Sequence, residues 1–323
     1  MSRPFRFAVQ SFNADSPQAW RDRAKKVEDL GYSALHLADH YIGNGPQLVK
    51  TNHPMQGLAS IPAMTVAAEA TSTLKIGCRV FCVDYHVPAV LVKNAMTIDW
   101  FSGGRLEFGL GAGWLAGEYE AMGVALDPPG ERISRLEEMI AAAKALMAPG
   151  EVDIHGTNIN LYGFQGEPQP VAGTPPIMIG GGSKRVLTLG GREADIVSFN
   201  FDNSSGMIGP LGVASGMAEQ TLKKVQWVKD GAAAAGRPIP ELEIGAYFTF
   251  VVDDPIPVAE GFGAMFGMSA ADVMQYPHAL VGPASALVDE LQRRREAYGI
   301  SYVTVNDQNL EAFAPVVAQL AGR

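Results

Sequence analysis

Short apolar runs alternate along the chain with longer segments in which apolar residues recur every three or four positions. The short runs are typical of buried parallel strands, and the longer segments are typical of amphipathic helices. The first unit shows both patterns, because a strand at residues 5–10 is followed by a helix from Pro17 to the residue before Gly31. Ser16 is the expected N-cap of this helix, and proline is favoured at the first helical position.

The alternation repeats eight times and predicts the class of fold. The predicted strands cover residues 5–10, 33–38, 74–83, 105–110, 176–179, 196–199, 242–252 and 302–305. The predicted helices cover residues 17–30, 62–72, 89–100, 131–147, 184–192, 214–235, 258–268, 284–298 and 310–320. Strands that are each followed by a helix predict an α/β fold, a TIM (β/α)8 barrel that forms one domain over residues 1–323.

Three intervals are too long for ordinary connections and are predicted to be insertions after strands 2, 4 and 7. They cover residues 41–61, 149–176 and 252–283. Long loops in compact domains are often functional. Within the second interval, residues 152–155 and 159–162 are expected to pair as a small hairpin around Gly156.

An open dinucleotide-binding sheet is the alternative architecture, since Asp39 stands at the end of the second strand, where that fold carries an acidic residue. Its first turn should be rich in glycine, but residues 11–15 contain none. The glycine run at residues 109–113 comes later in the chain and has Trp114 where the third glycine of the fingerprint belongs. The sequence therefore favours the barrel.

Composition and charge exclude several classes of function. The chain is 47% hydrophobic and 18% charged, which predicts a globular protein. Its net charge of -9 and scattered basic residues disfavour a nucleic-acid partner. We expect a cytoplasmic protein without a membrane span, because residues 1–7 lack a signal-peptide core and no apolar stretch approaches about eighteen residues. Cys78 and Cys82 form neither a disulfide framework nor a zinc pattern, so no metal site is predicted.

Polar, small and aromatic residues follow the predicted strands, at the edge where barrel enzymes carry their active sites. Asp39 and His40 place a carboxylate and an imidazole at the end of the second strand, whereas His36 is expected to be a buried core residue. The turn at residues 180–183 joins a strand to a helix, so its amides and the helix N-terminus could bind a phosphate. The predicted turn residues are Gly180, Gly181, Gly182 and Ser183.

Several motifs together resemble the bacterial luciferase-like family of flavin and deazaflavin oxidoreductases over nearly the whole chain. The similar segments are residues 30–32, 38–40, 74–77, 101–106, 109–114 and 180–195. The most specific combination is Ser-Gly-Gly-Arg-Leu followed by Gly-x-Gly-x-Gly-Trp. The resemblance implies the same barrel, the coenzyme F420 or FMN as cofactor, a small-molecule substrate and a homodimer.

The resemblance also implies where the cofactor lies. A flavin-like ring is expected at the barrel mouth against strand three, and a non-proline cis peptide is expected near Arg79-Val80. Asp39 and His40 match positions that meet the cofactor and the reacting substrate in deazaflavin enzymes. The residues expected to hold the cofactor are Asp39, Arg79, Val80, Cys82, Gly111, Ala112, Gly113, Trp114, Gly180, Gly181, Gly182 and Ser183.

The implied activity is hydride transfer between F420 and a small organic substrate, with His40 handling the proton and Asp39 holding the cofactor or orienting His40. Sugar-phosphate dehydrogenases of the family have a glutamate in place of Trp114, and an indole cannot serve as that acid. An apolar or aromatic substrate is therefore expected. The alternatives are an FMN-dependent monooxygenase and a flavin-binding protein that has lost turnover.

Overall fold

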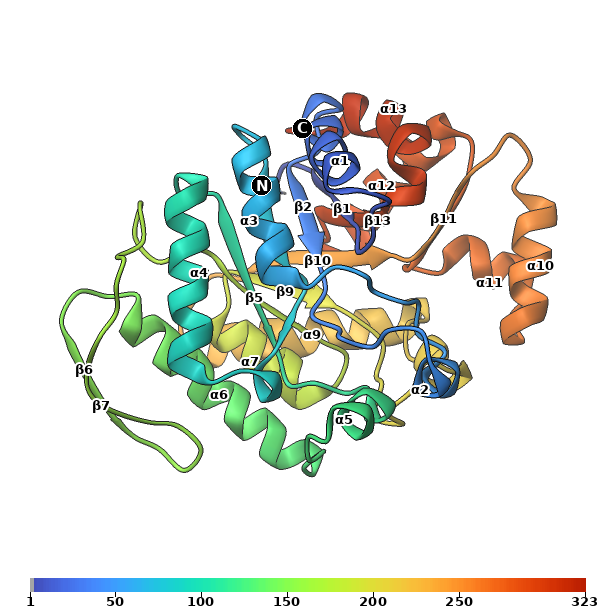
Figure 1. The fold of residues 1–323 in the computed structure, drawn as a ribbon. Coiled ribbons are helices and arrows are strands. Elements are labelled where there is room, and N and C mark those ends of the chain that lie inside the picture. The colour runs from blue at the N-terminus through green and yellow to red at the C-terminus, as the bar shows by residue number, and fades with distance from the viewer. Residues whose placement is uncertain (1–2) are drawn as a thin grey trace.

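The computed structural model describes residues 3–323 and shows eight parallel strands closed into a barrel and surrounded by helices (Figure 1). The barrel strands are β1 (Arg6–Gln10), β2 (Ala34–Leu37), β3 (Lys75–Cys78) with its continuation β4 (Phe81–Cys82), β5 (Leu106–Gly111), β8 (Ile177–Gly181), β9 (Ile196–Phe199), β10 (Glu241–Ala246) and β13 (Tyr302–Asn306). Pairing of β1 with β13 and of β3 with β5 completes the ring. The predicted TIM barrel is confirmed.

Helices of the repeating units pack their apolar faces against the outside of the barrel. They are α1 (Pro17–Asp29), α3 (Ser60–Ala70), α4 (Pro88–Ser102), α6 (Pro129–Leu146), α7 (Lys184–Glu193), α9 (Ala218–Ala234), α12 (Ala284–Tyr298) and α13 (Leu310–Leu320). In α1 the buried residues are Trp20, Ala24 and Val27, one face of the helix, and Ser16 accepts a hydrogen bond from the Ala19 amide as its N-cap. This apolar face is the one that the spacing indicates.

The third barrel strand is interrupted. The prediction of one continuous strand over residues 74–83 is wrong, because the chain breaks at Arg79 and Val80 and resumes as β4. The peptide bond between these two residues is cis, as the resemblance implied. The break separates the part that pairs with β2 from the part that pairs with the end of β5.

The three predicted insertions are present. The first contains α2 (Pro46–Thr51), and the second is an antiparallel hairpin of β6 (Glu151–His155) and β7 (Asn160–Gln165). The third contains α10 (Ile256–Phe266) and α11 (Ala270–Gln275), which project from one side of the barrel (Figure 1). Their apolar side chains form a small core of their own around Phe262 and Tyr276.

Two boundaries differ from the prediction. The apolar run at residues 242–252 is not one strand. Its second part, β11 (Phe248–Val251), leaves the barrel and pairs with β12 (Ala279–Gly282). The helix predicted over residues 214–235 begins later, at Ala218, as α9, and a separate short helix, α8 (Pro210–Ala214), precedes it. An apolar run shows that a segment is buried, but it does not show which neighbouring strand it joins.

The Ser-Gly-Gly-Arg-Leu segment has a structural role. Gly103 and Gly104 adopt positive φ angles of 69° and 85° and end α4. The guanidinium of Arg105 then donates to the carbonyl oxygens of Ala68 and Leu74, at 2.7 and 2.6 Å. Arginine hydrogen bonds to the last carbonyls of a helix satisfy groups that the helix leaves free. This motif fixes the end of α3 against β5.

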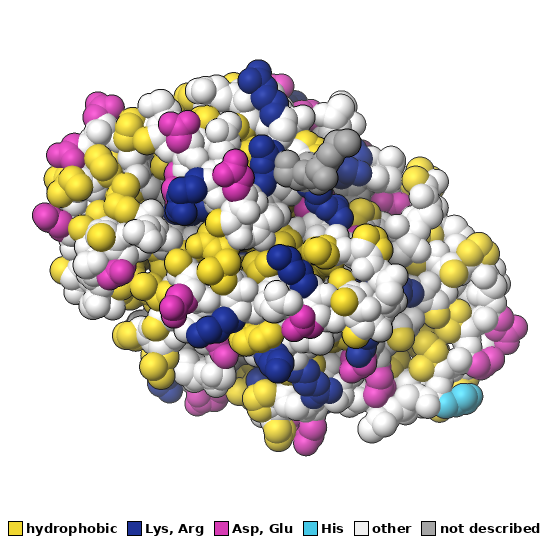
Figure 2. All heavy atoms as spheres, turned by 180° about the vertical axis from the view of Figure 1, so that it is seen from behind, with side chains coloured by type: hydrophobic (Ala, Val, Ile, Leu, Met, Phe, Trp, Pro, Cys, Tyr) yellow, Lys and Arg dark blue, Asp and Glu magenta, His cyan; other side chains and the backbone are white. Residues whose placement is uncertain are grey.

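The charged side chains are mixed over the surface. On the face opposite to that of Figure 1, Lys and Arg side chains lie beside Asp and Glu side chains (Figure 2). Within residues 3–323, every helix is too short or too polar to cross a bilayer.

Candidate active site

His40 lies at the barrel mouth just beyond β2 and is paired with a buried carboxylate. Its Nδ1 atom is 2.7 Å from Oε2 of Glu118, and the side chain of His40 is 14% exposed. Glu118 lies on α5 (Ala116–Met122), a short helix after β5 that the sequence pattern did not predict. The hydrogen bond places the proton of neutral His40 on Nδ1 and leaves Nε2 as the nitrogen that can exchange a proton with a ligand.

Glu118 is held in its ionised form. Besides His40, its oxygens accept hydrogen bonds from the amides of Tyr41 and Ile42 and from the Tyr85 hydroxyl. Burial alone would raise the pKa of Glu118, but the hydrogen bonds from His40, Tyr41 and Tyr85 lower it below its ordinary value. A buried carboxylate that stays charged is a strong acceptor for the imidazole N–H that it contacts.

Aromatic rings surround His40 on its other sides. The ring centre of His53 is 4.1 Å from that of His40, and that of the Trp114 indole is 6.0 Å away with the two ring planes nearly perpendicular. His53 donates from Nδ1 to the Pro54 carbonyl oxygen at 2.8 Å. Burial and the nearby His40 lower the pKa of His53 to about 3, so this second imidazole stays neutral. The surroundings of His40 are therefore apolar and aromatic.

Asp39 does not orient His40, contrary to one of the two roles predicted for it. Its oxygens are occupied by the Ser60 hydroxyl at 3.1 Å, the Cys82 amide at 3.0 Å and Nε2 of His86 at 2.7 Å. The side chain is fully buried. Through its bond from the Cys82 amide, Asp39 links the end of β2 to β4. The carboxylate that orients His40 is that of Glu118.

Arg79 and Val80, the two residues at the break in the third strand, both contact the barrel interior. Arg79 donates from Nε to Glu243 at 2.9 Å and from Nη1 to the Tyr247 hydroxyl at 3.0 Å. The guanidinium is therefore a buried group that the barrel interior already engages, and cofactor binding by Arg79 stays a prediction. Val80 packs against side chains inside the barrel, such as Met178 and Tyr302, but remains partly exposed. Of the two residues at the break, Val80 is therefore the one whose side chain a bound ring could contact.

Two of the glycines predicted to contact the cofactor lie against Val80, and their contact with a cofactor stays a prediction. A Cβ atom at Gly111 would lie 2.5 Å from a Val80 methyl group, and one at Gly180 would lie 3.0 Å from the other methyl group. Real Cβ atoms essentially never approach to 2.5 Å, and a contact of 3.0 Å is tighter than most. Gly113 has a positive φ of 71°, and a Cβ there would overlap the Tyr119 hydroxyl. These glycines make room for neighbouring side chains.

The rest of the two glycine segments lies at the mouth. The carbonyl oxygens of Ala112 and Gly113 accept hydrogen bonds from Arg132, which fixes the turn that carries Trp114. Cys82 is buried, its Sγ is 3.3 Å from the Tyr119 hydroxyl, and burial raises the pKa of its thiol to about 12. Its thiol is therefore neutral and packed against the protein.

The turn at residues 180–183 retains the features of an anion site. Gly181 ends β8, and a side chain at Gly182 would overlap the backbone of Phe201. Ser183 is the N-cap of α7, and its side chain makes no capping hydrogen bond. Lys184 and the first-turn amides of α7 are therefore free to meet an anion. These residues fit a cofactor that carries a phosphate.

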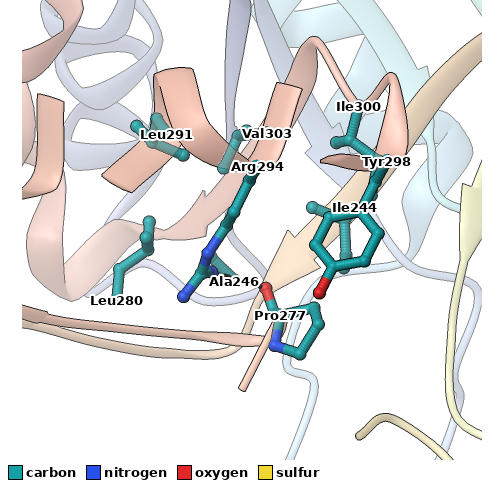
Figure 3. A pocket seen from close by; sticks show the side chains of 9 residues that line it. All are labelled: Ile244, Ala246, Pro277, Leu280, Leu291, Arg294, Tyr298, Ile300 and Val303. Carbon is teal, nitrogen blue, oxygen red and sulfur yellow. Dashed lines mark hydrogen bonds between the residues drawn. The ribbon is translucent and has the colours of Figure 1, made fainter. Parts of the chain in front are cut away.

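A small cavity elsewhere in the molecule is not a ligand site. It lies between β10, β13 and α12, with a volume of about 10 Å³, and Arg294 runs through it (Figure 3). That volume is close to the least that holds one water molecule. The guanidinium of Arg294 already donates hydrogen bonds to Glu290 and to the Pro277 carbonyl oxygen.

Three site residues were missed or left without a role by the sequence analysis. Glu118 lies on α5, a helix that the hydrophobic pattern does not predict, so the sequence carried no signal for its contact with His40. His53 and His86 lie in loops of the barrel mouth, and nothing in their local sequence indicates that they contact His40 and Asp39.

Known proteins with similar sequences include a reductase and a monooxygenase. The chain is 23% identical over 324 residues to the 5,10-methylenetetrahydromethanopterin reductase of Methanopyrus kandleri, with 95% of this chain and 84% of that protein covered. It is also 31% identical over 121 residues to the FMNH(2)-dependent dimethylsulfone monooxygenase of Pseudomonas putida, with 37% and 33% covered.

Solved structures show the same fold. The F420-dependent tetrahydromethanopterin reductase of Methanopyrus kandleri superposes with a TM-score of 0.75 at 20% identity, over 98% of both chains. An F420-dependent secondary alcohol dehydrogenase superposes with a TM-score of 0.76 at 16% identity, also over 98% of both chains. The model of the family described as luciferase-like monooxygenase matches residues 3–298. With this match and the mouth geometry, the chain belongs to the luciferase-like monooxygenase family of oxidoreductases and monooxygenases.

Proposed function

We propose that this protein is an F420-dependent oxidoreductase that transfers a hydride between the deazaflavin and a small apolar or aromatic substrate. The observation that carries the proposal is the His40–Glu118 pair at the barrel mouth, with a distance of 2.7 Å between Nδ1 and Oε2. When bound, the deazaflavin ring supplies the hydride chemistry.

The side chains of this chain would handle the proton and position the reactants. His40 gives a proton to the substrate, or takes one from it, through Nε2, which has no hydrogen-bond partner among residues 3–323. Glu118 keeps the imidazole oriented through its hydrogen bond to Nδ1. Val80 on the bulge and the turn at residues 180–183 would hold the ring and the phosphate of the cofactor.

The aromatic surroundings support the substrate class. Trp114 and His53 line two sides of His40, and Tyr41 at the same edge is 42% exposed. A neutral imidazole and an indole favour an apolar or aromatic body over a sugar phosphate. The two structural neighbours described as F420-dependent support the choice of cofactor.

Binding measurements test the cofactor directly. Separate titrations with F420 and FMN, followed by fluorescence quenching, should show tight binding of F420. His40→Ala should retain this binding and lose turnover, because His40 is proposed to act on the substrate. Failure of both cofactors to bind would overturn the proposal.

An FMN-dependent monooxygenase is the second candidate. It is favoured by the identity to the dimethylsulfone monooxygenase and by the fold shared with a long-chain alkane monooxygenase, at a TM-score of 0.77 and 15% identity. Tight binding of FMN, together with oxygen consumption that depends on reduced FMN and an organic substrate, would decide for this activity.

A further inference from the structure

A groove lies on the outside of the barrel between α6 and α7, which lie side by side in Figure 1. Its volume is about 370 Å³. It is lined by cationic, acidic and apolar side chains, chiefly Lys184, Arg185, Arg192, Glu137, Ile133 and Leu189. None of these residues belongs to the surroundings of His40, and the proposed hydride transfer does not use the groove.

The groove begins beside the turn at residues 180–183. Lys184 is the first residue of α7, and Arg185 donates from Nη1 to the carbonyl oxygen of Gly130 at the start of α6, at 2.7 Å. In a barrel of this kind, the helix after each strand begins at the mouth and runs back along the outside. The groove therefore leads away from the proposed phosphate site, down the outer surface.

The upper end of the groove carries two cations, of which only Arg185 has a carboxylate partner among residues 3–323, in a long ion pair with Glu137. Arg185 is held by two neutral acceptors, the Gly130 carbonyl oxygen and the Ser134 hydroxyl, and its nearest carboxylate, Glu137, is 3.9 Å away. Lys184 has no hydrogen-bond or ion-pair partner among residues 3–323. An anion would meet an arginine that is already immobilised, which lowers the entropy cost of binding.

The lower end differs from the upper end. Arg192 pairs with Glu137 and Glu193, so its charge is already compensated. Ile133 and Leu189 provide an apolar wall between the two ends. A chain of methylene groups that carries carboxylates near the upper cations would match this distribution.

We propose that the groove binds the anionic tail of the cofactor beyond its phosphate, an inference that rests on the proposed use of F420. The side chain of F420 continues past its phosphate through a lactyl group into linked glutamates, whereas FMN ends at the phosphate. The carboxylates of the tail pair with Lys184 and Arg185. Since the whole chain has a net charge of -9, a polyanion needs such a local concentration of cations.

The test compares F420 that carries several glutamates with the same compound lacking them, by fluorescence quenching at low and high salt. Wild-type protein should bind the glutamylated form about tenfold more tightly at low salt, as two partly solvated ion pairs allow. The difference should fall severalfold in Lys184→Gln, disappear in the Lys184→Gln/Arg185→Gln variant, and shrink at high salt. Lys223→Gln, at an exposed lysine of α9, is the matched control and should retain it.

The possible failures are distinct. Equal wild-type affinity for the two forms would overturn the groove inference and leave the proposed function standing. Failure of either form to bind would overturn both. If Lys184→Gln weakened the two forms equally, Lys184 would act on the phosphate, and the tail assignment would be wrong. Lys184 makes no contact that folding needs, so the single variant remains informative if the double variant is unstable.

Discussion

Two histidines that are four residues apart in sequence, His36 and His40, each contact a glutamate, but the two pairs differ in role. His36 contacts Glu107 at 3.0 Å and His40 contacts Glu118 at 2.7 Å, and both carboxylates are buried. The side chain of His36 is 1% exposed, while that of His40 is 14% exposed. Access to a ligand, and not the pair itself, distinguishes the candidate proton carrier from the structural residue.

The position along the second strand causes this difference. His36 lies within β2 and points into the barrel, where the carboxylate of Glu107 also accepts hydrogen bonds from Tyr302 and Arg6. Burial would raise the pKa of Glu107, but the bonds from His36 and Arg6 lower it to about 2. His40 comes after the strand has ended, so its ring meets the residues of the mouth loops.

The largest effect is expected inside the barrel. Glu107→Ala removes the partner of Arg6, His36 and Tyr302, and should lower the free energy of unfolding by about 3–5 kcal/mol, as for other broken buried ion pairs. Urea denaturation measures this change. The exposed ion pair of Lys26 with Glu311 supplies a control, since Glu311→Ala should cost less than about 1 kcal/mol. Similar losses in both variants would contradict a structural role for the inner pair.

Turnover should depend on the outer pair. His40→Ala should reduce kcat by on the order of a hundredfold or more, about 2.7 kcal/mol in the activation free energy, because proton transfer to the substrate is lost. Cofactor affinity and unfolding free energy should change little. Steady-state kinetics with F420 and stopped-flow ring absorbance measure the loss. An unchanged rate would leave His40 with a binding role only.

Acid should destabilise the protein through Glu107. Because its pKa is about 2 in the folded protein and near 4.5 when unfolded, its contribution is complete above the unfolded value and is lost as the pH falls toward 2. Wild-type protein should lose about 2 kcal/mol more than Glu107→Gln between roughly pH 5 and pH 3. Urea midpoints at the two pH values measure this difference. An equal loss in the variant would show that other carboxylates dominate.

The sequence predicted the barrel and the position of His40 for a physical reason. Repeated strand and helix periods determine which faces are buried, and that pattern determines the architecture. The partner of His40 could not be predicted, because Glu118 reaches it through the unpredicted helix α5. Asp39 is adjacent to His40 in sequence, but adjacent residues of an extended chain point in opposite directions, so it meets His86 instead. Contacts between different loops depend on tertiary structure.

The smallest of the expected effects separates orientation from charge at the outer pair. Glu118→Gln keeps the size of the side chain but removes its negative charge, so the charge-assisted hydrogen bond to His40 becomes a weaker neutral one. We expect kcat to fall about tenfold, which is about 1.4 kcal/mol and less than for His40→Ala. Steady-state kinetics measure this loss. Glu120→Gln, at an exposed glutamate of the same helix, is the matched control. If kcat of Glu118→Gln matched that of the control, the charge of Glu118 would not contribute to turnover, and the electrostatic part of the comparison with Glu107 would be wrong.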